Sequence, residues 1–158
     1  MDGEKGVLRY RGYDIEDLAK NADFLEVAFL LIFGELPTSE QLDKFLVDIK
    51  EESYIDEDLK KILESFPSAA HPMGVLSSLT SALTAFNPKT FDVESEDEMY
   101  RAIVRIMCKL PVLVALVFRK KSGLPLKYGD YALCYVENIA RMMFRKPNKE
   151  YEIGRAHV

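Results

Sequence analysis

GVLRYRGYDIEDLA, residues 6–19, changes from an extended pattern to a helical pattern that then continues along the chain. The apolar residues of VLRY, 7–10, lie between two glycines, which favours a short extended or turn segment. Asp14 follows in the position of a helix cap, so we expect a helix over Ile15–Lys20. Beyond this segment the apolar residues recur mostly at helical spacing, which predicts an all-α fold.

A second helix is expected over Phe24–Phe33, which is almost wholly apolar after Glu26 and ends at Gly34. Such a helix should be buried on most sides. A third helix follows, because Thr38 and Gln41 have the spacing of a capping box. Its expected apolar stripe is Leu42, Phe45, Leu46 and Ile49, and its expected solvated face includes Asp43, Lys44 and Glu51.

Two further helices are expected in the middle of the chain. Asp56 can cap the first, which carries apolar residues as far as Phe66 and is closed by Pro67. Residues 68–72 then form a loop. The second, 73–86, reads MGVLSSLTSALTAF and alternates large apolar residues with small ones. Small side chains let a neighbouring helix approach closely, so we expect a central or subunit-interface helix.

The acidic stretch Asp92–Glu98 is expected to begin a long helix that runs to about Lys121. This start places carboxylates at the positive end of the helix dipole. Pro111 lies inside the helix and should kink or break it. The last complete helix is expected over Tyr131–Phe144, before Pro147.

Composition is that of an ordinary globular protein. The 158 residues are 48% apolar, which is enough to form the core of one domain. The formal net charge is -5 and no dense basic block occurs, which argues against nucleic-acid binding. No apolar run approaches the ~20 residues of a membrane span, and the start MDGEKG lacks the apolar segment of a signal peptide. We therefore expect a soluble, cytoplasmic chain with no nucleic-acid or membrane partner.

Cysteine and methionine residues point to packing rather than to chemistry. Cys108 and Cys134 lie within apolar helical patterns, and their spacing matches neither a disulfide framework nor a zinc site. We expect both to be buried thiols. The methionines expected to fill the core are Met73, Met99, Met107, Met142 and Met143.

The last six residues, 153–158, read IGRAHV, which is the translation of a common sequencing-library adapter. We therefore expect a non-native tail at 153–158 and exclude it, with His157, from fold reasoning. The alternative is a natural polar terminus. The expected organisation is one partial helical domain over residues 1–152, followed by this tail.

A series of short segments shares its order and spacing with one known family. They are Glu26–Leu31, Gly34–Thr38, His71–Leu76, Lys109–Pro111, Tyr135–Asn138 and Met142–Phe144. Residues 6–19 likewise resemble GI-x-x-x-RGY-x-I-x-x-LA of the citrate synthases, in the bacterial-type branch. The resemblance runs from about Asp2 to Glu152 without a large gap. No single motif would suffice, but several in register identify the family.

The resemblance implies a Claisen-type condensation, in which acetyl-CoA adds to oxaloacetate and the citryl thioester is hydrolysed to citrate and CoA. In such a reaction an aspartate and two histidines act on the reacting groups, and arginines bind the substrate carboxylates. In the family these groups lie in the downstream half, after HADHE-like and GPxHGG-like segments, and neither segment occurs in this chain. We therefore expect no catalytic, cofactor-binding or metal-binding residues, and an inactive fragment.

The resemblance also implies a fold class and partners. We expect multi-helix orthogonal or antiparallel packing like the large domain of citrate synthase, but incomplete. The parent enzyme should be a homodimer or higher homo-oligomer that acts on small-molecule substrates without a cofactor. His71 lies in an HPM segment whose histidine is not one of the family's active-site histidines, so we expect a capping or structural role. A lone histidine builds neither a metal site nor a triad.

One regulatory site of the family can be compared residue by residue. Some bacterial relatives bind NADH as an inhibitor, and Arg105 and Lys109 match an R-x-x-x-K pair of that site. The other positions depart from it, since they read Glu51–Tyr54, Asn87 and Tyr131. The two acidic residues would repel an anionic dinucleotide. We expect a parent without NADH control, in which Arg105 and Lys109 form a solvated i,i+4 face.

Two alternatives stay open. The first is a fragment of 2-methylcitrate synthase, which uses propionyl-CoA, because the residues that shape the acyl pocket are absent from the chain. The second is a self-standing helical interaction module without catalytic chemistry, which would account for the missing catalytic groups. The family register favours the truncated enzyme.

Overall fold

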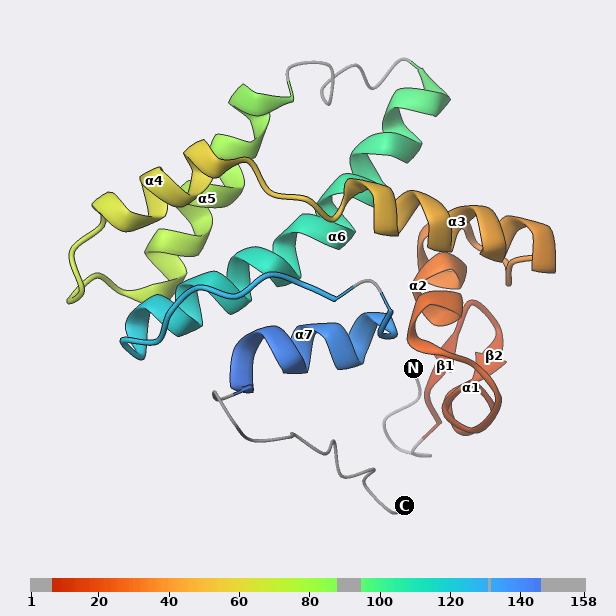
Figure 1. Ribbon diagram of the computed structural model, residues 1–158. Coiled ribbons are helices and arrows are strands. Elements are labelled where there is room, and N and C mark those ends of the chain that lie inside the picture. The colour runs from red at the N-terminus through yellow and green to blue at the C-terminus, as the bar shows by residue number, and fades with distance from the viewer. Residues whose placement is uncertain (1–6, 88–94, 131, 146–158) are drawn as a thin grey trace. The chain divides into compact units, whose positions relative to one another are not determined.

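The computed structural model describes residues 7–87, 95–130 and 132–145, and Figure 1 shows their secondary structure. The chain divides into two compact units, Met1–Val47 and Asp48–Val158. The boundary falls inside a helix, α3, and each unit is described by itself. The expected non-native tail and the expected helix stop at Pro147 lie outside the described residues, as do the first residues of the acidic stretch before Ser95.

The first unit begins with a hairpin of two short strands, β1 (Arg9–Tyr10) and β2 (Tyr13–Asp14). The strands are antiparallel, with Arg9 opposite Asp14 and Tyr10 opposite Tyr13. Arg11 and Gly12 connect them with φ values of 50° and 93°. A two-residue turn with both φ values positive matches the right-handed twist of paired strands, and glycine adopts it without strain. The expected extended or turn segment is confirmed.

Helices α1 (Ile15–Asn21) and α2 (Phe24–Phe33) follow, at the expected places. The Asp14 side chain accepts a hydrogen bond from the backbone N–H of Glu16 at 3.0 Å, which confirms its role as a cap. Gly34 ends α2 with φ 95°, in the left-handed region that favours glycine.

Burial of α2 differs from the prediction. Leu25, Phe29 and Leu30 are buried, and Phe29 packs edge-on against Phe45 with ring centroids 5.5 Å apart. The remaining large apolar side chains are partly exposed, and Phe24 retains 55% of its accessible surface. The described chain therefore covers only one face of α2, whereas burial on most sides was expected. The other exposed apolar residues of α2 are Leu31, Ile32 and Phe33.

Helix α3 (Ser39–Glu52) has the predicted cap and the predicted faces. The Thr38 N–H donates to the Gln41 side chain at 2.8 Å, and the Gln41 N–H donates to the Thr38 hydroxyl at 3.3 Å. Phe45 and Ile49 are buried on the apolar stripe. The predicted solvated residues, Asp43, Lys44 and Glu51, are exposed.

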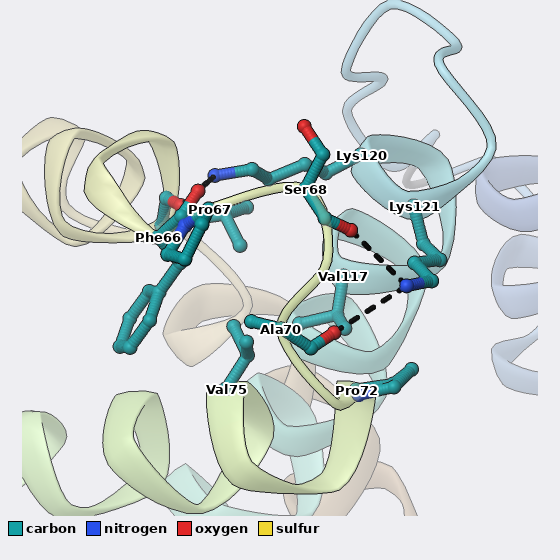
Figure 2. A pocket seen from close by; sticks show the side chains of 10 residues that line it. Phe66, Pro67, Ser68, Ala70, Pro72, Val75, Val117, Lys120 and Lys121 are labelled. Carbon is teal, nitrogen blue, oxygen red and sulfur yellow. Dashed lines mark hydrogen bonds between the residues drawn. The ribbon is translucent and has the colours of Figure 1, made fainter.

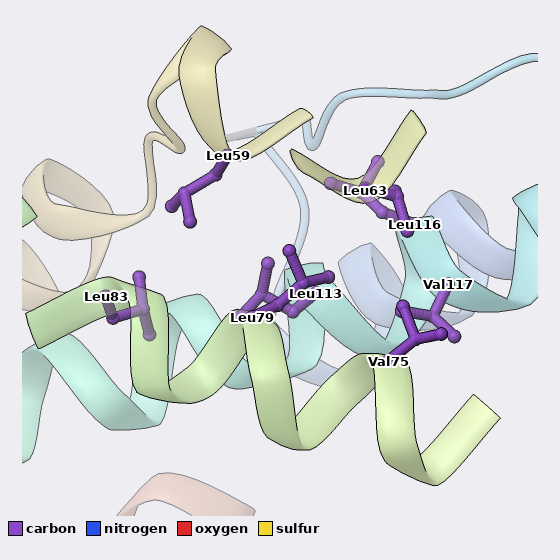
Figure 3. Packing of buried hydrophobic residues seen from close by; sticks show 8 residues of the cluster. All are labelled: Leu59, Leu63, Val75, Leu79, Leu83, Leu113, Leu116 and Val117. Carbon is purple, nitrogen blue, oxygen red and sulfur yellow. The ribbon is translucent and has the colours of Figure 1, made fainter. Parts of the chain in front are cut away.

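The core of the second unit lies between α4 (Glu57–Ser65), α5 (Pro72–Phe86) and α6 (Glu96–Lys121). Figure 3 shows that α5 carries its large apolar residues on the side that meets the other two helices. The expectation of a central helix is thus confirmed within this unit. Some of the small residues of α5, among them Ser77, Ser78 and Ser81, are exposed, and a subunit interface on their face stays a prediction. The core residues are Leu59, Leu63, Val75, Leu79, Leu83, Leu113, Leu116 and Val117.

Two of the expected caps can be compared directly. His71 precedes α5, and its Nδ1 atom accepts a hydrogen bond from the Met73 N–H at 3.3 Å, which confirms the structural role. Asp56 occupies the cap position of α4, but its side chain makes no capping hydrogen bond. The position was therefore right, and the expected contact was not found.

Helix α6 begins at Glu96, within the acidic stretch expected to start it, and the Ser95 hydroxyl accepts a hydrogen bond from the Glu98 N–H and caps the helix there. Three acidic residues still occupy its first turn, as expected. Pro111 does not break the helix. Figure 1 shows that the two halves of α6 run in different directions, so the helix bends without breaking, which is one of the two outcomes expected.

Helix α7 (Tyr135–Phe144) starts later than the predicted Tyr131, which itself lies outside the described residues. The Asp130 carboxylate accepts a hydrogen bond from the Ala132 N–H and forms a turn before the helix. Glu137 then accepts from the Cys134 N–H, as in a capping box. Side-chain hydrogen bonds to the backbone therefore delay the helix.

Three side-chain placements correct the sequence analysis. Cys108 is buried as expected, but Cys134 is exposed because it precedes α7 instead of lying inside it. Met73 and Met99 are 63% and 47% exposed, since each lies in the first turn of its helix rather than in the core. No helix in the described ranges is long and apolar enough to cross a membrane.

Candidate functional site

Arg105 and Lys109 lie one turn apart on α6, as their spacing predicted. Their predicted exposure was wrong. The Arg105 side chain is 14% exposed and the Lys109 side chain 9% exposed. The cause is the carboxyl end of α3, where Glu52 covers both cations.

The contacts around Glu52 are charged hydrogen bonds and ion pairs. Arg105 donates from Nε to Glu52 Oε2 at 3.2 Å and from Nη2 to Oε1 at 3.3 Å, in a two-point arrangement. Lys109 Nζ lies 3.9 Å from Glu52 Oε2 and donates to the backbone carbonyl of Tyr54 at 2.5 Å. One carboxylate and one carbonyl therefore hold two largely buried cations.

A further contact joins α3 to α6 beside this cluster. The Tyr100 hydroxyl donates to Asp48 Oδ2 at 2.7 Å. Burial raises the pKa of Tyr100 above its ordinary value, and the hydrogen bond to Asp48 adds to this shift. Tyr100 is therefore a neutral donor at neutral pH, and its hydroxyl joins α6 to Asp48 of α3.

The arrangement can hold an anion only if that anion displaces Glu52. Of the positions compared with the NADH site, the structure brings together Arg105, Lys109, Glu52 and the backbone of Tyr54. Asn87 instead ends α5, where its side chain donates to the Leu83 carbonyl at 3.2 Å. Tyr131 lies outside the described residues. Burial raises the pKa of the neighbouring Cys108 thiol to about 11, so this thiol is not an activated nucleophile.

Two lysines at the end of α6 form a second polar cluster that the sequence analysis missed. Lys120 Nζ donates to the carbonyls of Leu63, Glu64 and Phe66, the last at 2.7 Å. Lys121 Nζ donates to the carbonyls of Ser68 and Ala70, at 3.1 and 3.5 Å.

Figure 2 shows both lysines at the edge of a small hollow. The hollow is lined mainly by apolar side chains, among them Phe66, Val75 and Val117. The Lys120 ammonium points at carbonyls at the end of α4, and the Lys121 ammonium points at carbonyls of the α4–α5 connection. The cluster therefore holds both the end of α4 and the α4–α5 connection against α6. Three successive basic residues at a helix end were the available signal in the sequence.

Arg119 is a third polar group that sequence reasoning missed. It is only 2% exposed, and its guanidinium donates to the carbonyls of Pro125 and Met142 at 2.5 and 3.2 Å. It also reaches the carbonyls of Met143 and Arg145. The last carbonyls of α7 are the negative end of the helix dipole, which compensates the buried charge. Arg119 therefore fixes the carboxyl end of α7.

Side chains that could bind a metal ion are not clustered in the described part of the chain. Within residues 7–87, 95–130 and 132–145, no group of three or more His, Cys, Asp or Glu side chains could hold a metal ion. His71 Nδ1 is occupied as a helix cap.

Comparison with known proteins gives a consistent result. The family described as citrate synthase, C-terminal domain, matches residues 1–154. The citrate synthase of Corynebacterium glutamicum is 45% identical over 153 residues, which is 97% of this chain and 35% of that protein. Citrate synthase 1 of Mycobacterium tuberculosis is 41% identical over 152 residues, 96% of this chain and 35% of that protein.

A solved structure extends the likeness to the fold. The citrate synthase of Pyrobaculum aerophilum superposes with a TM-score of 0.82 at 28% sequence identity. The match covers 91% of this chain and 38% of that one. The chain thus spans about a third of the length of the curated relatives it matches, which are covered to 35%.

Proposed function

The chain belongs to the citrate synthase family, and from this premise we propose that it is part of an enzyme that condenses acetyl-CoA with oxaloacetate to give citrate and CoA. The family match over residues 1–154 is the observation that carries the proposal. Under it, the parent enzyme takes small-molecule substrates, needs no cofactor or metal, works as a homodimer or higher homo-oligomer and is cytoplasmic.

The proposed role of these residues is to support a site built elsewhere in the parent enzyme. Arg105, Lys109 and Arg119 all bind groups of this chain, and His71 caps a helix. The sequence contains neither an HADHE-like nor a GPxHGG-like segment. We therefore propose that the 158-residue chain has no catalytic activity by itself.

A chimaera tests this role. Residues 1–152 would replace the matching segment of the Corynebacterium glutamicum relative, and CoA release would be measured with acetyl-CoA and with propionyl-CoA. We expect the chimaera to be active, because residues 1–152 should adopt the same fold as the segment they replace and pack against the catalytic half in the same way. A folded chimaera without activity would favour a non-catalytic module. A preference of the chimaera for acetyl-CoA or propionyl-CoA would not tell whether this chain comes from a citrate synthase or a 2-methylcitrate synthase. The acyl pocket belongs to the segment that the relative supplies.

We also propose that the parent enzyme lacks inhibition by NADH. The support is Glu52, which already pairs with Arg105 and Lys109, while the neighbouring Glu51 adds a second negative charge. An anionic dinucleotide would have to displace one carboxylate and approach another. Inhibition of the parent enzyme by micromolar NADH would contradict this proposal, and unchanged activity would support it.

A further inference from the structure

Pro111 creates a specific problem inside α6. Proline has no backbone N–H, so the carbonyl four residues earlier, that of Met107, loses its helical partner. The proline ring also crowds that carbonyl and favours a bend. Helix α6 nevertheless continues from Glu96 to Lys121 and changes direction along its length (Figure 1).

The orphaned carbonyl is bonded by a side chain from another helix. The hydroxyl of Tyr135, the first residue of α7, donates to the Met107 carbonyl at 2.6 Å. This is a normal O–H···O distance. Burial raises the pKa of Tyr135 to about 12, so the hydroxyl keeps its proton throughout the neutral range.

Space lies next to this contact. A small hollow there, lined by residues of both helices, is bordered by Pro111, Val112, Tyr135 and Met142. Helices packed at full density cannot change their bend without a clash. The hollow beside Pro111 shows that packing is less dense there, which lets α6 change its angle slightly if the tyrosine contact opens.

We propose that Pro111 is a hinge in α6 and that Tyr135 is the latch that holds this hinge in one position. The docking of α7 then sets the direction of the amino-terminal half of α6. That half carries Tyr100, Arg105 and Lys109, which bind the end of α3. The hinge thus links α7 to the cluster of Glu52, Arg105 and Lys109. This proposal does not depend on the proposed enzymatic activity.

The test is a double-mutant cycle on the 158-residue chain, read by amide hydrogen exchange. Tyr135→Phe removes only the hydroxyl and should raise exchange of α6 amides around Met107 about five- to tenfold, as expected for one lost hydrogen bond. Pro111→Ala restores a backbone N–H for the Met107 carbonyl. In that background Tyr135→Phe should change exchange less than about twofold, because the carbonyl already has a partner.

Tyr128→Phe is the matched control, since the Tyr128 hydroxyl bonds Glu57 on α4 instead. It should leave exchange around Met107 unchanged. Equal effects of Tyr135→Phe in both backgrounds would overturn the proposal, as would no effect in either. If the Pro111→Ala variant fails to fold, the Tyr135→Phe variant alone still tests the proposal, through the location of the amides whose exchange becomes faster. Faster exchange throughout α4 and α5 after Tyr135→Phe would mean general destabilisation and would contradict a local latch.

Discussion

Glu52 pairs with two cations that are largely shielded from water. No sequence pattern around Glu52 predicts this pairing. Arg105 and Lys109 follow more than fifty positions later, on another helix. Family register selected this pair of cations, but their burial and pairing depend on the tertiary contact between α3 and α6. A sequence pattern at i,i+4 spacing predicts a shared face, and it does not predict what covers that face.

Replacing Glu52 tests how much this pairing contributes. Glu52→Gln should lower the free energy of unfolding by about 1–2 kcal/mol, because two buried cations lose their counter-charge. The effect should stay below that of a fully buried pair, since the Glu52 side chain is 37% exposed. Urea unfolding measures it. Glu51→Gln is the control on an exposed neighbour, and an equal loss there would argue against the pairing.

Two neutral groups make stability depend on alkaline pH. Burial raises the pKa of Cys108 from 9.0 to about 11 and that of Tyr135 from 10.0 to about 12. The unfolded chain therefore loses these protons first as pH rises. Their contribution should be complete below about pH 9 and lost progressively towards pH 12.

Thermal melts between pH 8 and pH 12 measure this dependence. The melting temperature should fall across the range, and Tyr135→Phe should reduce the slope above pH 10, because one titrating group is gone. A slope unchanged by Tyr135→Phe would contradict the assignment.

At the scale of elements, helix ends show what local sequence can and cannot specify. The ends at Asp14, Thr38 and Gly34 were predicted, because their hydrogen bonds or φ values involve neighbouring residues. The start of α7 was misplaced, since turn contacts of Asp130 compete with the helix. The hydrogen bond from Tyr135 to the Met107 carbonyl, which Pro111 leaves without a helical N–H, is not revealed by any local pattern.

The end of α4 provides a prediction at this scale. Lys120 donates to three carbonyls there, so Lys120→Met should lower the free energy of unfolding by about 1–3 kcal/mol. Lys121→Met is the matched variant and should cost less, because its two contacts are exposed and longer. Chemical denaturation followed by circular dichroism compares them. An equal or larger loss of unfolding free energy for Lys121→Met would contradict the stabilising role assigned to the Lys120 hydrogen bonds.

For the whole molecule, the order of motifs predicted the fold class and the family, and both are confirmed. Packing could not be predicted to the same depth. The exposed side of α2 and the buried guanidinium of Arg119 both depend on which segments meet, and a linear pattern does not record this. The sequence analysis located the pair Arg105 and Lys109. It missed the contacts of Arg119, Lys120 and Lys121 with backbone carbonyls of the second unit.

The central claim is that these residues form the supporting part of a citrate synthase and hold none of its reacting groups. The most direct measurement is CoA thiol release by the purified 158-residue chain with acetyl-CoA and oxaloacetate, beside a complete family enzyme. We predict no release above the enzyme-free background, while the complete enzyme turns over. Citrate formation by the chain alone would contradict the account.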